Sequence, residues 1–505
     1  MPSTFDKKRS FDVEAEIMET DINKYFAQTV TYYFGEDSFA IRNEAYDDML
    51  WVVLGWLESI QFINTHSKNH HPLNMDHIHE KHEWYAQQFI PAFAHRARVF
   101  YELAEQGWDW RLCGGGMTWN PRLLPYKNAI TNELFISASI GMYLHFPGDS
   151  NCSPFMSAET AHPTKKNLKT EQSDEAQTCA ENVTSIYDPI YLANAVNGYD
   201  WLANSNMKNE HGLYVDGFHI KDYATNHSKT ECNERNEMVY TYNQGVVLSG
   251  LRGLWEATGN KTYLEDGHTL VQNVIRTTRW TKLTDTFFPP DIPLSTKECD
   301  EKASPMNDWA GLGAHGLLTE YCDPSGTCSQ DGQTFKGIFF HHLTSFCTPL
   351  PTTPVRQGKT HAASKKLANM HRRNCTHYTP WIIHNARAAL RTRDAKGRFG
   401  AWWGAPPSHT SPSPTQTPSP HILRHSSRNA IDYRNRPSLL SHSSFGLVMQ
   451  QNPAVDVEMG PQREYTEAKD DLNDRGRGRT LETQSGGLAV VRAMWEFLRT
   501  DEVKD

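Results

Sequence analysis

The sequence predicts an all-α fold in which helical hairpins close into an α/α toroid. Three observations lead to this prediction. Apolar residues recur with a period near 3.6, strand-like alternation is rare, and several expected helices are apolar nearly all round. Because a helix without a polar face is buried on all sides, we expect an inner ring of helices wrapped by an outer ring. A helical solenoid is the weaker alternative, since the sequence has no fixed repeat period.

The periodicity predicts about eleven helices. The stretch GLWEATGNKTYLEDGHTLVQNVI is typical of a helical hairpin, because one helix ends at Gly259 and Asn260 and the next begins almost at once. The expected segments lie at about 13–33, 44–63, 80–106, 127–145, 187–204, 240–258, 262–279, 308–320, 333–347, 367–392 and 482–499.

Two stretches stand apart from the helical pattern. Residues 406–445 begin with PPSHTSPSPTQTPSP, a composition with little to bury, and we expect a disordered insert between two parts of one barrel, 1–405 and 446–505. The His-rich stretch 66–82 invites a metal, but His77 and His79 at i, i+2 would not share a helix face. We therefore expect a solvated loop there and no metal site.

Composition excludes several classes of function. The 505 residues carry a net charge of −9 without a basic stripe, which argues against a nucleic-acid partner. No apolar stretch reaches the roughly 20 residues of a transmembrane helix. Nine cysteines include the turn YCDPSGTC, which predicts a disulfide between Cys322 and Cys328 and an oxidising compartment. Five glycosylation sequons support this: Asn151, Asn182, Asn226, Asn260 and Asn374.

The strongest chemical signal is the pair Asp47 and Asp48 at the start of YDDMLWVVLGWLESI. One aspartate could simply cap the following helix, although Asn43 could do this equally well. Adjacent helical residues point about 100° apart, so two short side chains can hold their carboxyls at the roughly 5–5.5 Å of a retaining glycosidase pair. The roughly 6.5–9.5 Å of an inverting pair is harder to reach.

Five blocks of the sequence carry a resemblance to a known family: YDDMLWVVLGWLE, TWNPRLLPYKNAITNELFISASIGMYL, NEMVYTYNQGVVLSGLRGLWEATGNKTYL, QTFKGIFFHHL and LETQSGGLAVVRA. Together they resemble glycoside hydrolase family 76, in family order over roughly 40–500. The resemblance implies an endo-α-1,6-mannanase with an (α/α)6 barrel, acting on α-1,6-mannan or a related mannose-containing glycan without a cofactor.

The resemblance also implies residue roles. It makes Asp47 the nucleophile and Asp48 the acid/base. The other matching positions are expected to bind substrate, with helix capping or loop support as the structural alternative. These positions are Tyr126, Lys127 and Asn128, then Tyr242, Asn243 and Gln244, and less directly Asp216 and Lys336.

The chain departs from the family in ways that shape the expectation. A barrel of this kind has twelve helices, so the first helix is expected to be missing, as in a gene model shortened at its N-terminus and lacking a signal peptide. We expect a monomer located outside the cell or in the cell wall. The alternatives are a cell-wall transglycosylase of the same fold and a catalytically impaired mannan-binding protein.

Overall fold

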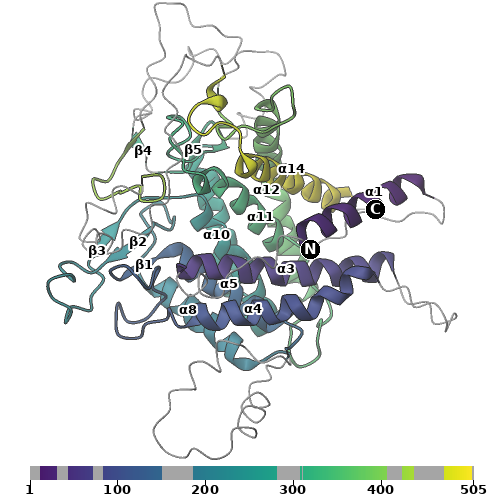
Figure 1. Cartoon of the computed structure of the whole chain (residues 1–505), viewed down its shortest axis with the longest axis horizontal. Coiled ribbons are helices and arrows are strands. Elements are labelled where there is room, and N and C mark those ends of the chain that lie inside the picture. The colour runs from purple at the N-terminus through teal and green to yellow at the C-terminus, as the bar shows by residue number, and fades with distance from the viewer. Residues whose placement is uncertain are drawn as a thin grey trace, which may run out of the picture. The chain divides into compact units, whose positions relative to one another are not determined.

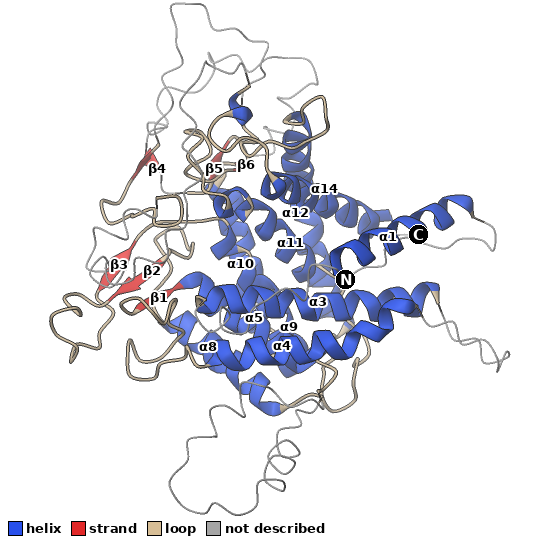
Figure 2. Ribbon diagram, in the orientation of Figure 1, coloured by secondary structure: helices blue, strands red, loops and turns tan. Residues whose placement is uncertain are grey.

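A computed structural model describes residues 12–30, 44–71, 84–149, 186–280, 308–309, 311–405, 423–436 and 471–502. These residues are predominantly helical, as the sequence predicts (Figure 2). The chain divides into two compact units. The first comprises Met1–Trp108, Trp119–Pro121 and Ala138–Ala195, and the second comprises Asp109–Thr118, Arg122–Ser137 and Val196–Asp505.

Helices α3 and α4 pack against each other in the first unit (Figure 1). Val53, Leu57 and Ile60 share one face of α3 at helical spacing, and Phe93 and Ala97 of α4 are equally buried. The elements of this unit are α1 (Val13–Val30), α3 (Tyr46–His70), the 3-10 helix η1 (Tyr85–Phe89), α4 (Ile90–Glu105) and parts of α5 (Ala129–His145) and α8 (Pro189–Asn204).

The His-rich stretch begins inside α3 rather than in a loop. His66 and His70 are both buried. The expected solvated loop is therefore wrong for the start of 66–82, because α3 continues to His70; residues 72–82 lie outside the described part.

In the second unit, α11 packs against α9 and α14, and α14 also packs against α12. The hairpin expected at Gly259 is confirmed: α9 ends at Thr258, α10 begins at Thr262, and Gly259 has a left-handed φ of 73°. The helical elements are η2 (Tyr242–Gln244), α9 (Val246–Thr258), α10 (Thr262–Thr277), η3 (Asp331–Gln333), α11 (Phe335–Phe346), α12 (Lys365–Arg391), η5 (Leu472–Asp474) and α14 (Leu481–Glu502).

Short strands add three small sheets to the second unit. In the largest, β2 lies between β1 and β3 in antiparallel register, with Lys127 opposite Phe218 and Phe218 opposite Arg235. A Cβ at Gly217 would lie 2.6 Å from the carbonyl oxygen of Lys127, so this pairing requires glycine. The strands are β1 (Tyr126–Asn128), β2 (Gly217–His219), β3 (Glu234–Asn236), β4 (Asp308–Trp309), β5 (Gly313–Ala314), β6 (Leu317–Leu318) and β7 (Arg424–His425).

The helix expected at 308–320 is wrong, and this stretch carries strands β4, β5 and β6 instead. Gly313 and Gly316 have φ values of 152° and 78°, and His315 has φ 54°. A right-handed helix cannot contain such residues, so the glycines outweigh the apolar period here. Each of the other ten expected segments contains a described helix.

The insert expected at 406–445 is not wholly disordered. Residues 423–436 are part of the second unit and contact its other segments, while 406–422 and 437–445 lie outside the described residues. The Asp432 carboxylate accepts a hydrogen bond of 2.8 Å from the Tyr240 hydroxyl, and the Ile431 N–H donates to Asn236 Oδ1 at 2.8 Å. Hydrogen bonds to buried polar groups of distant segments hold residues 423–436 in place. The composition of the segment gave no sign of these bonds.

Three disulfides join described cysteines. The predicted bond between Cys322 and Cys328 is confirmed. Disulfides persist in oxidising environments, so they suggest the secretory pathway. The other two bonds are Cys113–Cys232 and Cys347–Cys375.

Two of the sequon asparagines, Asn226 and Asn260, are exposed, and Asn374 is half-buried. Asn151 and Asn182 lie outside the described residues. Among the described helices, none has the length and apolar character to cross a bilayer.

Candidate active site

The expected catalytic pair lies in the first turn of α3. Ala45 is the N-cap residue, with φ −69° and ψ 152°, and no side chain caps this helix end. Asp47 is 3% exposed, whereas its neighbour Asp48 is exposed. Neither aspartate is therefore the N-cap, which removes the simplest structural explanation for placing the two acids side by side.

The start of α3 is held from both sides within the first unit. The Tyr46 N–H donates to the carbonyl of Trp119 at 2.9 Å. The Tyr46 ring covers Gly107 so closely that a Cβ there would lie 2.6 Å from the ring. Burial raises the pKa of Tyr46. The helix N-terminus also carries partial positive charge, which stabilises carboxylates in its first turn.

Tyr126 and Asp216, both expected to bind substrate, lie together in the second unit. The Tyr126 hydroxyl donates to Asp216 Oδ2 at 2.5 Å, and Asn236 Nδ2 donates to the same oxygen at 3.1 Å. Asp216 is 1% exposed. Burial raises its pKa, and the charge of Arg434 and the bond from Tyr126 offset only part of this rise. This trio connects β1 and β3 through the residue that directly precedes β2.

Lys127 and Asn128 make contacts that support the backbone. Lys127 is fully buried, and its Nζ donates to the carbonyls of Asp109, at 3.4 Å, and of Gly116. Burial lowers the pKa of Lys127 to about 8, against the opposing effect of Asp109. Asn128 Oδ1 accepts from the N–H of Thr131 at 3.3 Å in the first turn of α5.

The three residues of η2 differ in what they do. Gln244 binds the backbone of Tyr214 twice, accepting from its N–H and donating to its carbonyl, each at 2.8 Å. The Tyr242 ring stacks on Phe335 with centroids 3.8 Å apart. Asn243 is fully buried, and neither atom of its amide has a hydrogen-bond partner among the described residues. Of the three, Asn243 has the amide left available for another group.

Lys336 belongs to a buried charged cluster that the sequence did not predict. Its Nζ lies 2.6 Å from Asp323 Oδ2, and Glu320 Oε1 accepts from the N–H of Thr241 at 2.9 Å. Burial raises the pKa of Glu320 to about 7, and the charge of Lys336 opposes this rise. The only sign of this cluster in the sequence was the pair of acids, Glu320 and Asp323, on either side of Cys322 in TEYCD.

Glu133 is a second acid that the sequence analysis missed. It lies on α5, is fully buried, and neither carboxyl oxygen has a hydrogen-bond partner among the described residues. Burial raises its pKa well above the ordinary value, with Lys208 opposing. The signal was a lone acid within the apolar run AITNELFISASI.

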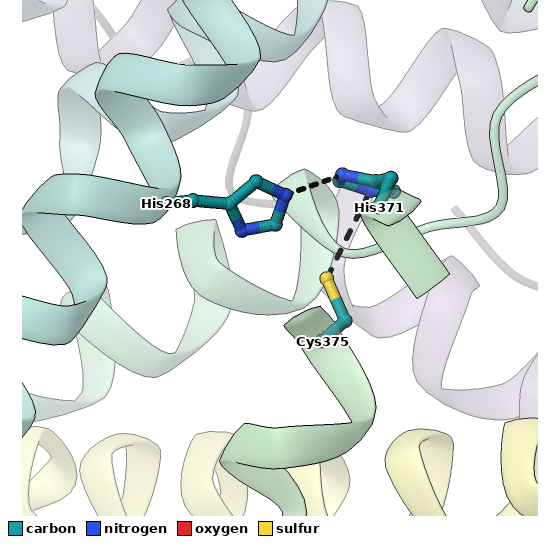
Figure 3. A group of neighbouring side chains, drawn as sticks. All are labelled: His268, His371 and Cys375. Carbon is teal, nitrogen blue, oxygen red and sulfur yellow. Dashed lines mark hydrogen bonds between the residues drawn. The ribbon is translucent and has the colours of Figure 1, made fainter. Parts of the chain in front are cut away.

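A buried cluster on α10 and α12 resembles a metal site, but one of its three potential ligands is part of a disulfide. His268 Nε2 lies 3.0 Å from His371 Nδ1, and His371 Nε2 lies 3.8 Å from Cys375 Sγ (Figure 3). Cys375 is bonded to Cys347, so its sulfur is not a thiolate ligand. Burial lowers the pKa of His268 to about 4 and that of His371 to about 3, so both rings are neutral.

Comparison with known proteins gives one relative by sequence and several by structure. The chain is 24% identical over 270 residues to mannan endo-1,6-alpha-mannosidase DFG5 of Saccharomyces cerevisiae, covering 51% of this chain and 41% of that protein.

Among solved structures, the GH76A alpha-1,6-mannanase from Salegentibacter sp. HEL1_6 is 18% identical, with a TM-score of 0.41 and coverage of 77% of this chain and 75% of that chain. Dfg5 from Chaetomium thermophilum in complex with glucosamine is 15% identical, with a TM-score of 0.40 and coverage of 72% and 61%.

The family model of glycosyl hydrolase family 76 matches residues 183–384. This range contains TYNQG at 241–245 and FKGIF at 335–339, two of the motifs that carried the resemblance. The resemblance to glycoside hydrolase family 76 is thereby confirmed over residues 183–384.

Proposed function

We propose that this chain is a retaining, endo-acting glycoside hydrolase that cleaves α-1,6-mannosidic linkages in mannan, with an (α/α)6 barrel as its fold. The observation that carries the proposal is the pair in the first turn of α3, where Asp47 is buried, Asp48 is exposed and neither caps the helix. The named activity of the relative from Saccharomyces cerevisiae supports the substrate class. We place the protein outside the cell or in the cell wall.

The difference in exposure between Asp47 and Asp48 fits two different catalytic roles. Asp47 would attack the anomeric carbon and form a covalent glycosyl-enzyme intermediate. Asp48 would first protonate the oxygen of the leaving sugar and then take a proton from the water that releases the product. An exposed acid can exchange its proton with solvent between turnovers, whereas the nucleophile needs no such exchange.

The residues expected to bind sugar differ in whether their polar atoms are already hydrogen-bonded within the protein. Lys127, Gln244 and Lys336 already use their polar atoms on the backbone or on a buried partner, whereas Asn128 uses only its Oδ1, and its buried Nδ2 has no partner among the described residues. The buried amide of Asn243 has no described partner on either of its atoms, and we propose Asn243 as the foremost sugar-binding residue. Tyr126, Asp216 and Tyr242 stay in the proposal as further sugar-binding residues.

The test is the hydrolysis of unbranched α-1,6-mannan by Asp47→Asn and Asp48→Asn, measured as release of reducing ends. We expect each change to lower the rate by a factor on the order of 100 to 10,000, because a positioned acid or nucleophile is lost. Glu44→Gln, which removes an exposed acid three residues before Asp47, is the matched control and should keep its activity. Circular dichroism confirms the fold of each variant, and near-normal activity in either aspartate variant rules the assignment out.

A further inference from the structure

Two histidines of the first unit converge on one carboxylate. Glu19 lies on α1, His66 lies on α3, and His71 is the residue that follows α3. His66 Nε2 is 3.0 Å from one carboxylate oxygen of Glu19, and His71 Nε2 is 3.1 Å from the other. Both ring nitrogens also lie within hydrogen-bond distance of the same oxygen, Glu19 Oε1, at 3.2 Å and 3.1 Å.

The spacing of these atoms suits a small divalent ion. One nitrogen or oxygen from each of the three residues lies within 4.8 Å of the others. In a tetrahedral zinc site with bonds of about 2.0–2.2 Å, ligand atoms lie about 3.4 Å apart. The two nitrogen–oxygen distances are a few tenths of an ångström shorter than this, so small side-chain shifts would admit the ion.

Of the three side chains, His66 is buried, whereas Glu19 and His71 are partly exposed to solvent. The His66 side chain is 1% exposed, and its ring lies 4.4 Å from that of Trp84, which donates to Asn23 Oδ1 of α1 at 2.7 Å. The side chains of Glu19 and His71 are 20% and 26% exposed. One histidine is therefore fixed in place, while solvent can deliver the ion and complete its coordination with water.

We propose that Glu19, His66 and His71 form a zinc site that ties α1 to the C-terminal end of α3. Imidazole and carboxylate ligands suit Zn²⁺, and a site with three protein ligands leaves a fourth position for water. The bound ion would replace a hydrogen-bonded contact between the carboxylate and two histidines by three metal–ligand bonds. Because binding requires the two helices to be packed, Zn²⁺ should stabilise the folded chain.

The test uses the full-length protein, freed of metal with a chelator and titrated with Zn²⁺ in a calorimeter. We expect one ion per chain and a rise in Tm with Zn²⁺ concentration. Glu19→Gln and His71→Gln should each weaken Zn²⁺ binding at least tenfold and lose the rise in Tm. Both side chains are partly exposed, so the variants should fold, and circular dichroism before zinc is added verifies this.

His95→Gln is the matched control, because His95 is also a partly exposed histidine of the first unit that contacts a carboxylate, Asp149 Oδ2, at 2.8 Å. It should bind Zn²⁺ as the parent chain does. The proposal is overturned if the parent chain binds no Zn²⁺ at micromolar concentration. It is equally overturned if Glu19→Gln and His71→Gln bind as tightly as the control, since other histidines would then hold the ion.

Discussion

Lys336 Nζ lies 2.6 Å from Asp323 Oδ2, and both side chains are at most 1% exposed. Two opposite charges are thus held away from water, and each depends on the other. The N–H of Glu320 also donates to Asp323 Oδ2, at 2.8 Å. Removing one charge therefore leaves the other uncompensated, and this makes the pair a sharp test of how the second unit is held together.

We expect Lys336→Met to lower the free energy of unfolding by about 3–5 kcal/mol, because Asp323 is left as a buried and unpaired carboxylate. Denaturant unfolding measures this. Adding Asp323→Asn to the variant should recover part of the loss, since the uncompensated charge is gone. Lys261→Met is the control: its pair with Glu265 is exposed and should contribute about 1 kcal/mol or less. Equal losses in the two single variants would contradict the prediction.

Glu320 should make stability depend on pH. Burial raises its pKa from 4.5 to about 7, so between these values the folded chain binds more protons than the unfolded chain. The contribution of Glu320 to stability is therefore fully present below about pH 4.5 and is lost as the pH rises through about 7.

Glu320→Gln, which removes the titrating group at nearly constant shape, should show a flatter decline of Tm over this range than the parent chain. Thermal melts in a series of buffers decide the matter. If the two chains decline in parallel, the folded-state pKa of Glu320 is not raised.

Deleting residues 406–445 should destabilise the chain by several kcal/mol. The deletion removes the acceptor of the buried Tyr240 hydroxyl, and a buried polar group left unpaired costs about 1–3 kcal/mol. It also removes the two hydrogen bonds between Ile431 and the Asn236 amide, whose bonds to Met238 and Asp216 remain. Asp432→Ala should show a smaller loss in the same direction. Arg428→Ala, an exposed change in the same segment, should have little effect. An unchanged Tm after the full deletion would show that 423–436 contributes nothing.

Hydrolysis should retain the anomeric configuration. Asp47 and Asp48 are consecutive residues of one helix, and such neighbours cannot easily leave the space for a water between a carboxylate and the sugar that inversion needs. Proton NMR of the first product from α-1,6-mannan, read before mutarotation, should show α-mannose. An initial β signal would mean inversion, and the base would then have to be another residue.

The sequence predicted most helices because the signals for a helix, its apolar period and its end residues, lie within one short stretch of chain. The run 246–258 is apolar on nearly every side and ends at a glycine, and the structure has α9 in that place. The failure at 308–320 has a local cause as well, since three residues with positive φ stand where the apolar period suggested a helix. The strand at Tyr126–Asn128 was missed because it pairs with Gly217–His219, from which it is separated by nearly 90 residues of chain.

The candidate site was predictable only in part, for the same reason. Adjacent acids such as Asp47 and Asp48 are visible in a single motif. The contact of Tyr126 with Asp216 and that of Lys336 with Asp323 depend on how distant segments pack, which no spacing along the chain reveals. The meeting of Glu19 with His66, 47 residues apart, is a further case, and here the sequence favoured a solvated loop.

The disulfides have a consequence for the order of events during biosynthesis. Cys322 and Cys328 are six residues apart, whereas Cys113 and Cys232 are separated by 119. At about 5–20 residues per second, the ribosome completes the first interval in about a second and needs roughly 6–24 seconds for the second. Cys113 therefore waits as a reactive thiol on the nascent chain until Cys232 emerges, and oxidation that runs ahead of translation would trap it with the wrong partner.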